Sequence, residues 1–81
     1  MKTNSFLLLI KEYLEIEDIE IKLETTFSSL SAFDSMGRMS IISLCDEHFN
    51  KAIGAEDLNK LVYIKDLIEL IGLEKFEDYH V

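Results

Sequence analysis

The chain has 81 residues, of which 48% are hydrophobic and 30% are charged, and its formal net charge is −8. This length allows one domain with one modest core, and the composition is too apolar for a disordered chain. The acidic balance excludes a nucleic-acid binder, which needs a basic surface, and it opposes binding to anionic membranes.

Cysteine content and the amino-terminal residues indicate a cytoplasmic protein. Because Cys45 is the single cysteine, neither an internal disulfide nor a cysteine zinc cluster can form. The apolar run of residues 6–10 is too short for a signal peptide or a membrane span. We therefore expect a cytoplasmic protein without membrane insertion, and a monomer is its simplest state.

Helices are the expected secondary structure, because the chain has no proline and only three glycines. The first is predicted over about residues 5–14, where apolar residues recur at helical spacing, with Asn4 or Ser5 as its cap. Residues 15–34 are expected to form a long ordered loop. The side chains expected to hold this loop on the core are Ile21, Leu23, Phe27 and Leu30.

The second helix is predicted to begin at Ser35 or Met36 and to end at Asn50. Asp34 and Ser35 stand where the cap of that helix belongs. Its apolar face is expected to contain Met36, Met39, Ile42, Cys45 and Phe49, widened by Ile41 and Leu44.

A short third helix is predicted over residues 55–61 and a fourth over about residues 63–71, where Gly72 ends it. Residues 73–81 are expected to form a loosely held tail. The predicted fold is therefore an all-α four-helix bundle in a single domain, with three longer helices, one short third helix and a helical part over about residues 5–72. Its expected core includes Phe6, Ile10, Leu14, Phe27, Ile42, Cys45, Phe49, Leu61, Ile64, Leu67 and Ile68.

The main candidate for chemistry is a serine at a predicted helix start. Ser35 directly follows Asp34. A phosphate ester on the Ser35 hydroxyl would meet free backbone N–H groups and the positive end of the helix dipole. An Asp-Ser pair at a helix start is also an ordinary cap, so these two residues alone leave both interpretations open.

The segment Asp34-Ser35-Met36-Gly37 resembles the Asp-Ser-Leu-Gly-type phosphopantetheine attachment motif of acyl and peptidyl carrier proteins. Further positions agree with that family in register, and the similarity covers residues 27–72, with a plausible first helix over residues 6–14. These positions are Phe49 at the end of the second helix, Ile53 with Glu56 and Asp57 in an acidic third helix, and Ile64-Lys65-Asp66-Leu67 at the start of the fourth.

The resemblance implies a carrier and not an enzyme. Ser35 would bear a covalent 4′-phosphopantetheine arm, attached from coenzyme A with Mg²⁺ by a phosphopantetheinyl transferase, and Asp34 would support recognition by that transferase. The arm would hold acyl or aminoacyl groups as thioesters and present them to loading and acyl-transfer enzymes. The residues that would contact these partners are Met36, Arg38, Met39, Glu56 and Asp57.

Departures from the family pattern indicate a specialised stand-alone carrier in a secondary or surface-polymer pathway. Fatty-acid carriers typically place acids along the second helix, where this chain has Arg38, Ser40 and Ser43. Gly54 stands where the family usually has proline, and Tyr63 stands where a threonine often caps the fourth helix.

Other kinds of site find little support. A hydrolase would need a base near Ser35, but His48 lies about 20 Å further along the same predicted helix, and His80 lies in the predicted tail. Asp46, Glu47 and His48 point apart as neighbouring helical residues, which disfavours a shared metal ion. A small acidic helical interaction module without a prosthetic group remains the open alternative.

Overall fold

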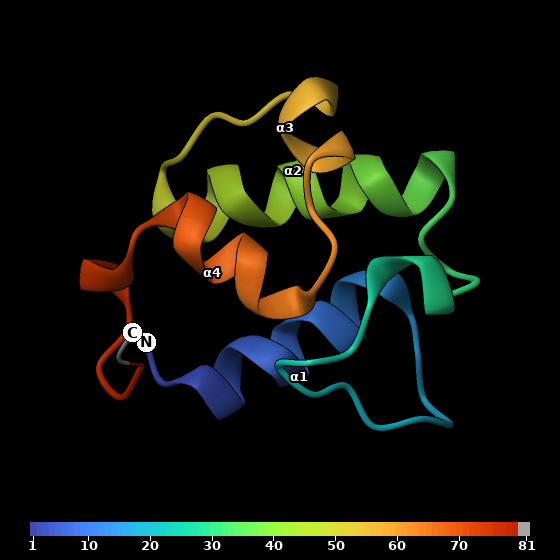
Figure 1. Ribbon diagram of the computed structural model, residues 1–81, viewed down its shortest axis with the longest axis horizontal. Helices are drawn as coiled ribbons and strands as arrows, with labels where there is room; N and C mark the ends of the chain where they lie inside the picture. The colour runs from blue at the N-terminus through green and yellow to red at the C-terminus, as the bar shows by residue number, and fades with distance from the viewer. Residues whose placement is uncertain (80–81) are drawn as a thin grey trace.

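In the computed structural model, which describes residues 1–79, four α-helices surround one apolar core (Figure 1). The elements are α1 (Thr3–Leu14), η1 (Phe27–Ser29), α2 (Ser35–Phe49), α3 (Ala55–Asn59), α4 (Ile64–Ile71) and η2 (Leu73–Lys75), where η denotes a 3₁₀ turn. α1 packs directly against α2, Figure 1 shows α4 beside them, and the Arg38–Asn59 hydrogen bond joins the end of α3 to α2. The predicted all-α bundle with one short third helix is confirmed.

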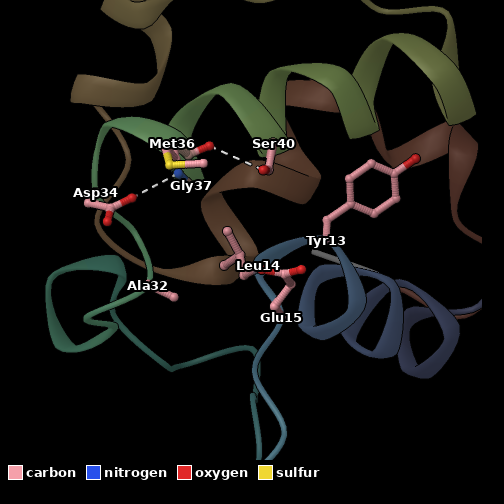
Figure 2. Close-up of a pocket in the computed structure, with 8 residues that line it drawn as sticks. All are labelled: Tyr13, Leu14, Glu15, Ala32, Asp34, Met36, Gly37 and Ser40. Atoms are coloured by element: carbon pink, nitrogen blue, oxygen red, sulfur yellow. Dashed lines mark hydrogen bonds between the residues drawn. The ribbon is translucent and has the colours of Figure 1, made fainter.

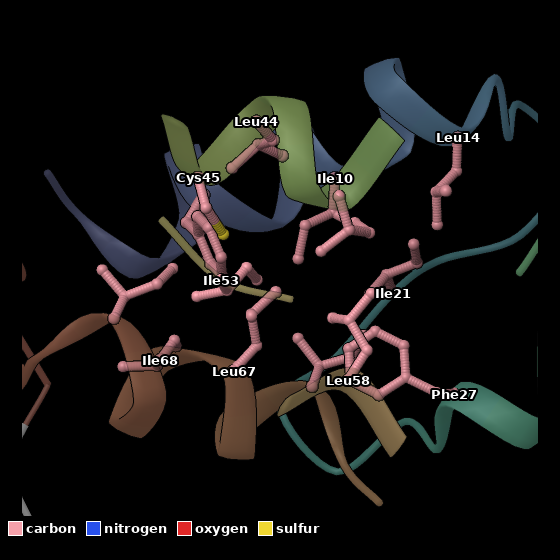
Figure 3. Packing of buried hydrophobic residues seen from close by; sticks show 14 of the residues in the cluster. Ile10, Leu14, Ile21, Phe27, Leu44, Cys45, Ile53, Leu58, Leu67 and Ile68 are labelled. Atoms are coloured by element: carbon pink, nitrogen blue, oxygen red, sulfur yellow. The ribbon is translucent and has the colours of Figure 1, made fainter. Parts of the chain in front are cut away.

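Apolar side chains from every α-helix and from the long loop form the core (Figure 3). Its buried members are Phe6, Ile10, Leu14, Ile21, Phe27, Leu30, Ile41, Leu44, Cys45, Phe49, Ile53, Leu58, Ile64, Leu67, Ile68, Ile71 and Phe76. Among the described residues, the core contains no buried polar side chain. Ile42 and Leu61, which were predicted in the core, are half-buried at its edge instead.

The buried face of α2 differs from the predicted face in the first two turns. Met36 is 79% exposed and Met39 is 70% exposed. The buried face passes through Ile41 and Cys45, and Met39 lies about 200° around the helix from Ile41. Both methionines are therefore surface residues, and core packing of Met39 is ruled out.

The loop between α1 and α2 is held by apolar anchors and by backbone pairing. Of its predicted anchors, Ile21, Phe27 and Leu30 are buried and Leu23 is half-buried. The Phe27 N–H donates to the Val62 carbonyl at 3.0 Å, and the Ile64 N–H donates to the Thr25 carbonyl at 2.9 Å. These bonds join the loop to the connection between α3 and α4.

Two carboxylates determine where the short helices begin. The Asp57 carboxylate accepts from the Gly54 N–H at 3.0 Å, at the start of α3. Asp66 accepts from the Tyr63 N–H at 2.8 Å, so α4 begins at Ile64, one residue later than predicted. α3 ends at Asn59, two residues before its predicted end.

α1 is capped by a residue from the other end of the chain. It begins at Thr3, earlier than predicted, and neither Asn4 nor Ser5 is its cap. The Thr3 N–H donates to Asp78 Oδ1 at 2.8 Å, and the Thr3 hydroxyl donates to Asp78 Oδ2 at 3.1 Å. The backbone hydrogen bond from Thr3 lowers the pKa of Asp78, because it favours the charged carboxylate.

Residues 73–79 pack on the bundle, in contrast to the loosely held tail predicted from the sequence. Phe76 is 6% exposed, and its ring centroid lies 5.1 Å from that of Phe6 and 5.5 Å from that of Phe49. The Glu77 N–H donates to the Met1 carbonyl at 3.0 Å. The remaining two residues of the predicted tail, 80 and 81, lie outside the described residues.

Replacing Phe76 by alanine tests whether this segment belongs to the folded domain. The Phe76→Ala variant should lose about 3–5 kcal/mol of unfolding free energy in a urea titration, because it leaves a cavity between two aromatic rings. The matched control is Glu77→Ala, an exposed neighbour, which should change stability by less than about 0.5 kcal/mol. Equal stability of Phe76→Ala and wild type would show that the segment does not contribute to the core.

Candidate functional site

Ser35 is the first residue of α2, and its side chain is exposed. Asp34 is the N-cap, and its Oδ1 accepts a hydrogen bond from the Gly37 N–H at 3.0 Å (Figure 2). The Asp34 carbonyl accepts the first helical bond, from the Arg38 N–H at 2.9 Å. The aspartate therefore makes the cap that the sequence predicted, and the Ser35 hydroxyl is left facing solvent at the positive end of the helix dipole.

Gly37 lets the start of α2 come very close to the preceding loop. A Cβ atom at Gly37 would lie 2.1 Å from the Ala32 carbonyl oxygen and 3.2 Å from Leu14 Cδ2. Such a contact with a backbone oxygen cannot be relieved by turning a side chain, so the backbone itself would have to move. The glycine of the Asp-Ser-Met-Gly segment is therefore needed for packing, and it holds the serine-bearing turn against both the loop and α1.

An open pocket of about 250 Å³ lies between the end of α1 and the start of α2 (Figure 2). Its lining residues are Tyr13, Leu14, Glu15, Ala32, Asp34, Met36, Gly37 and Ser40. The Ser40 hydroxyl donates to the Met36 carbonyl at 3.1 Å, so this serine is engaged within the helix. The pocket thus borders the two residues that flank Ser35 in the sequence.

On the other side of α2, Arg38 connects three segments. Its Nη1 donates to Asn59 Oδ1 at 2.8 Å, which links α2 to the end of α3. The guanidinium carbon lies 5.1 Å from the centroid of the Phe33 ring, and that ring lies 4.6 Å from the ring of Phe27. Sequence reasoning missed Asn59, because the spacing of residues on one helix does not reveal a partner on another.

The five predicted partner-contacting residues differ in how available they are. Met36 and Met39 are exposed on the first turns of α2, and Glu56 is exposed on α3. Arg38 is partly exposed and holds Asn59, whereas the Asp57 carboxylate caps α3. The Arg38–Asn59 bond joins the two helices that carry these residues.

Of the two histidines considered as a base for Ser35, His48 lies within the described residues. His48 Nε2 lies 3.1 Å from the Tyr13 hydroxyl, which in turn donates to Glu47 Oε1 at 3.2 Å. Partial desolvation and the contact with Glu47 raise the pKa of Tyr13. His48 lies on the last turn of α2, about 20 Å along the helix from Ser35, and is no base for that serine. His80 lies outside the described residues.

The described residues contain neither a metal-ligand cluster nor a membrane-spanning helix. Within residues 1–79, no group of three or more histidine, cysteine, aspartate or glutamate side chains is placed to share a metal ion. In the same part of the chain, no helix combines the length and the apolar character needed to cross a bilayer.

Comparison with known proteins agrees with this geometry. The family model described as "Phosphopantetheine attachment site" matches residues 5–71. The solution NMR structure of the holo acyl carrier protein from Geobacter metallireducens superposes with a TM-score of 0.70 and 22% sequence identity, covering 96% of this chain and 93% of that one. That likeness establishes the shared fold.

The family match defines the class of protein as a phosphopantetheine carrier, which is not an enzyme. Since the family match extends over most of the chain, the protein belongs to the phosphopantetheine attachment site family. A covalent 4′-phosphopantetheine is the prosthetic group of such a carrier. The residues at the start of α2 fit this group, because Ser35 offers an exposed hydroxyl and the first N–H groups of the helix lack helical acceptors.

Replacing Gly37 by alanine should destabilise the protein by about 1–3 kcal/mol, measured by urea unfolding, because the new methyl group collides with the Ala32 carbonyl. Gly54→Ala is the matched control. A Cβ atom there meets nothing within 4 Å, and the expected change is less than about 1 kcal/mol. A Gly37→Ala protein as stable as the Gly54→Ala protein would contradict the close approach.

Burial raises the pKa of the Cys45 thiol from 9.0 to about 12, so the folded protein should react very slowly with a thiol reagent at pH 8. The denatured protein should react at the ordinary rate. Because the fold favours the neutral thiol, its contribution to stability is complete below pH 9.0 and declines as the pH rises towards 12. Rapid labelling of the folded apo protein would contradict this burial.

Proposed function

We propose that the protein carries acyl or aminoacyl groups as thioesters on a 4′-phosphopantetheine arm attached to Ser35. The observation that carries this proposal is the exposed Ser35 hydroxyl on the first turn of α2, in a chain that belongs to the phosphopantetheine attachment site family. When bound, the arm supplies a terminal thiol, which the protein's own residues do not offer at the surface because Cys45 is buried.

In the attachment reaction, Ser35 Oγ forms a bond to the phosphorus next to the pantetheine part of coenzyme A. The pyrophosphate bond of coenzyme A breaks, adenosine 3′,5′-bisphosphate leaves, and the serine proton passes to a base of the transferase. Within residues 1–79 the histidine of the chain, His48, lies about 20 Å along α2 from Ser35, so the proposal assigns the base to a separate phosphopantetheinyl transferase with Mg²⁺. In this proposal Asp34 aids that enzyme, because its cap fixes the position of the serine.

The first two turns of α2 and the exposed edge of α3 form the surface that we propose for partner enzymes. Met36 and Met39 offer flexible apolar contacts next to Ser35, of the kind that suits several partners. Glu56 offers an exposed negative charge on α3, whereas Arg38 and Asp57 shape the surface through their bonds to Asn59 and Gly54.

The lack of acids on the first turns of α2 favours partners other than strongly basic enzymes. From Ser35 to Cys45 the helix carries one charged side chain, that of Arg38, and the first acid is Asp46. A strongly basic partner surface would meet little complementary charge there. On this basis we infer a specialised carrier that acts in a secondary or surface-polymer pathway.

Intact-mass spectrometry tests the attachment site. The purified protein is incubated with coenzyme A, Mg²⁺ and a broad-specificity phosphopantetheinyl transferase. The wild type should gain one phosphopantetheine, and one thiol of the folded protein should become reactive. Ser35→Ala should gain none, although losing this exposed side chain leaves the Asp34 cap intact. Ser40→Ala is the matched control, because Ser40 is bonded to the Met36 carbonyl, and it should still be modified.

Two outcomes would contradict the proposal. Modification of Ser35→Ala would place the arm on another residue. No gain on the wild type, with this transferase and with that of the source organism, would favour a small acidic interaction module without a prosthetic group.

A further inference from the structure

Arg38 is the only lysine or arginine between Lys22 and Lys51. The whole chain has a net charge of −8, so this region has few positive side chains. It follows Ser35 by three residues within α2, and helical residues at this spacing are neighbours, with Cβ atoms about 5–6 Å apart. The one positive side chain of this region is therefore long enough to reach the serine hydroxyl.

The guanidinium of Arg38 is held in place but is not saturated. The face of the Phe33 ring supports it at 5.1 Å, and Nη1 donates to Asn59 Oδ1 at 2.8 Å. A guanidinium has about five N–H donors. Within residues 1–79, this bond is the one side-chain hydrogen bond of Arg38. The bond to Asn59 is therefore the one side-chain hydrogen bond, among the described residues, that breaks if the guanidinium turns towards Ser35.

We propose that Arg38 binds the phosphodiester that joins the arm to Ser35, and that it gives up Asn59 in doing so. This inference rests on the proposed attachment to Ser35. A phosphodiester adds a negative charge next to the Asp34 carboxylate, and Arg38 is the nearby cation that can offset both. A charge-assisted bond from a guanidinium to a phosphate oxygen is stronger than its bond to the neutral Asn59 amide. Phe33 supports the guanidinium plane during the exchange.

If Arg38 leaves Asn59 for the phosphodiester, attachment of the arm to Ser35 changes how α3 is held. This helix has five residues, of which Leu58 is buried, and the Arg38–Asn59 bond ties its last residue to α2. When Arg38 turns to the phosphodiester, the end of α3 loses that tie. Partner enzymes that contact both helices then meet a different surface on the loaded carrier than on the apo protein.

NMR spectroscopy of the apo and loaded proteins tests this role. In the wild type, the Arg38 Nε–H and the Asn59 side-chain amide resonances should both shift on loading. The ³¹P resonance of the loaded wild type should differ from that of loaded Arg38→Gln, and Arg38→Lys should fall between them. The difference should shrink in 1 M salt, where the screening length is about 3 Å. Loaded Lys60→Gln, which removes an exposed charge near Asn59, should keep the wild-type ³¹P resonance.

The results separate this inference from the proposed attachment. If the wild type gains phosphopantetheine but its Arg38 and Asn59 side-chain resonances stay unchanged, Arg38 does not bind the phosphodiester and the carrier function stands. Equal ³¹P resonances in wild type and Arg38→Gln would likewise overturn the role of Arg38 alone. If the wild type gains no phosphopantetheine, both proposals fail. The wild-type comparison decides the question even if the transferase does not load Arg38→Gln.

Discussion

The close approach of Gly37 to the Ala32 carbonyl determines how the serine is presented. A Cβ atom at Gly37 would lie 2.1 Å from that oxygen, so the helix can pack here only without a side chain. The Asp34 cap on the Gly37 N–H begins the helix at this contact. Together they hold the first turn of α2 against the loop and the end of α1, while Ser35 remains exposed. A flexible turn would instead present the hydroxyl in many orientations to a modifying enzyme.

The surface around Ser35 combines apolar exposure with sparse charge. Met36 and Met39 are exposed to solvent in the free protein, so their side chains add no hydrophobic stabilisation to the fold. The inward face of α2 is filled by Ile41 and Cys45 instead. Exposed apolar groups next to a functional site are typical of surfaces that meet partners. Arg38 is the one charged residue between Ser35 and Cys45. Its contacts with Phe33 and Asn59 also make it part of the local packing.

Residues near the two termini of the chain pack against each other and against the bundle. Phe76 packs between aromatic rings of α1 and α2, and Asp78 caps the first turn of α1. This packing lies at the far end of α2 from Ser35, since Phe76 contacts Phe49, the last residue of that helix.

The helices and the candidate serine could be predicted from the sequence, because both depend on short-range interactions. Helical periodicity, the absence of proline and the Asp34 cap three residues before Gly37 all operate within one or two turns of chain. Only the packed fold shows which face of α2 is buried, where Phe76 docks and that Asp78 caps Thr3. It also pairs Arg38 with Asn59. Each of these contacts joins segments distant in sequence, so it depends on how the helices pack and leaves no local pattern to read.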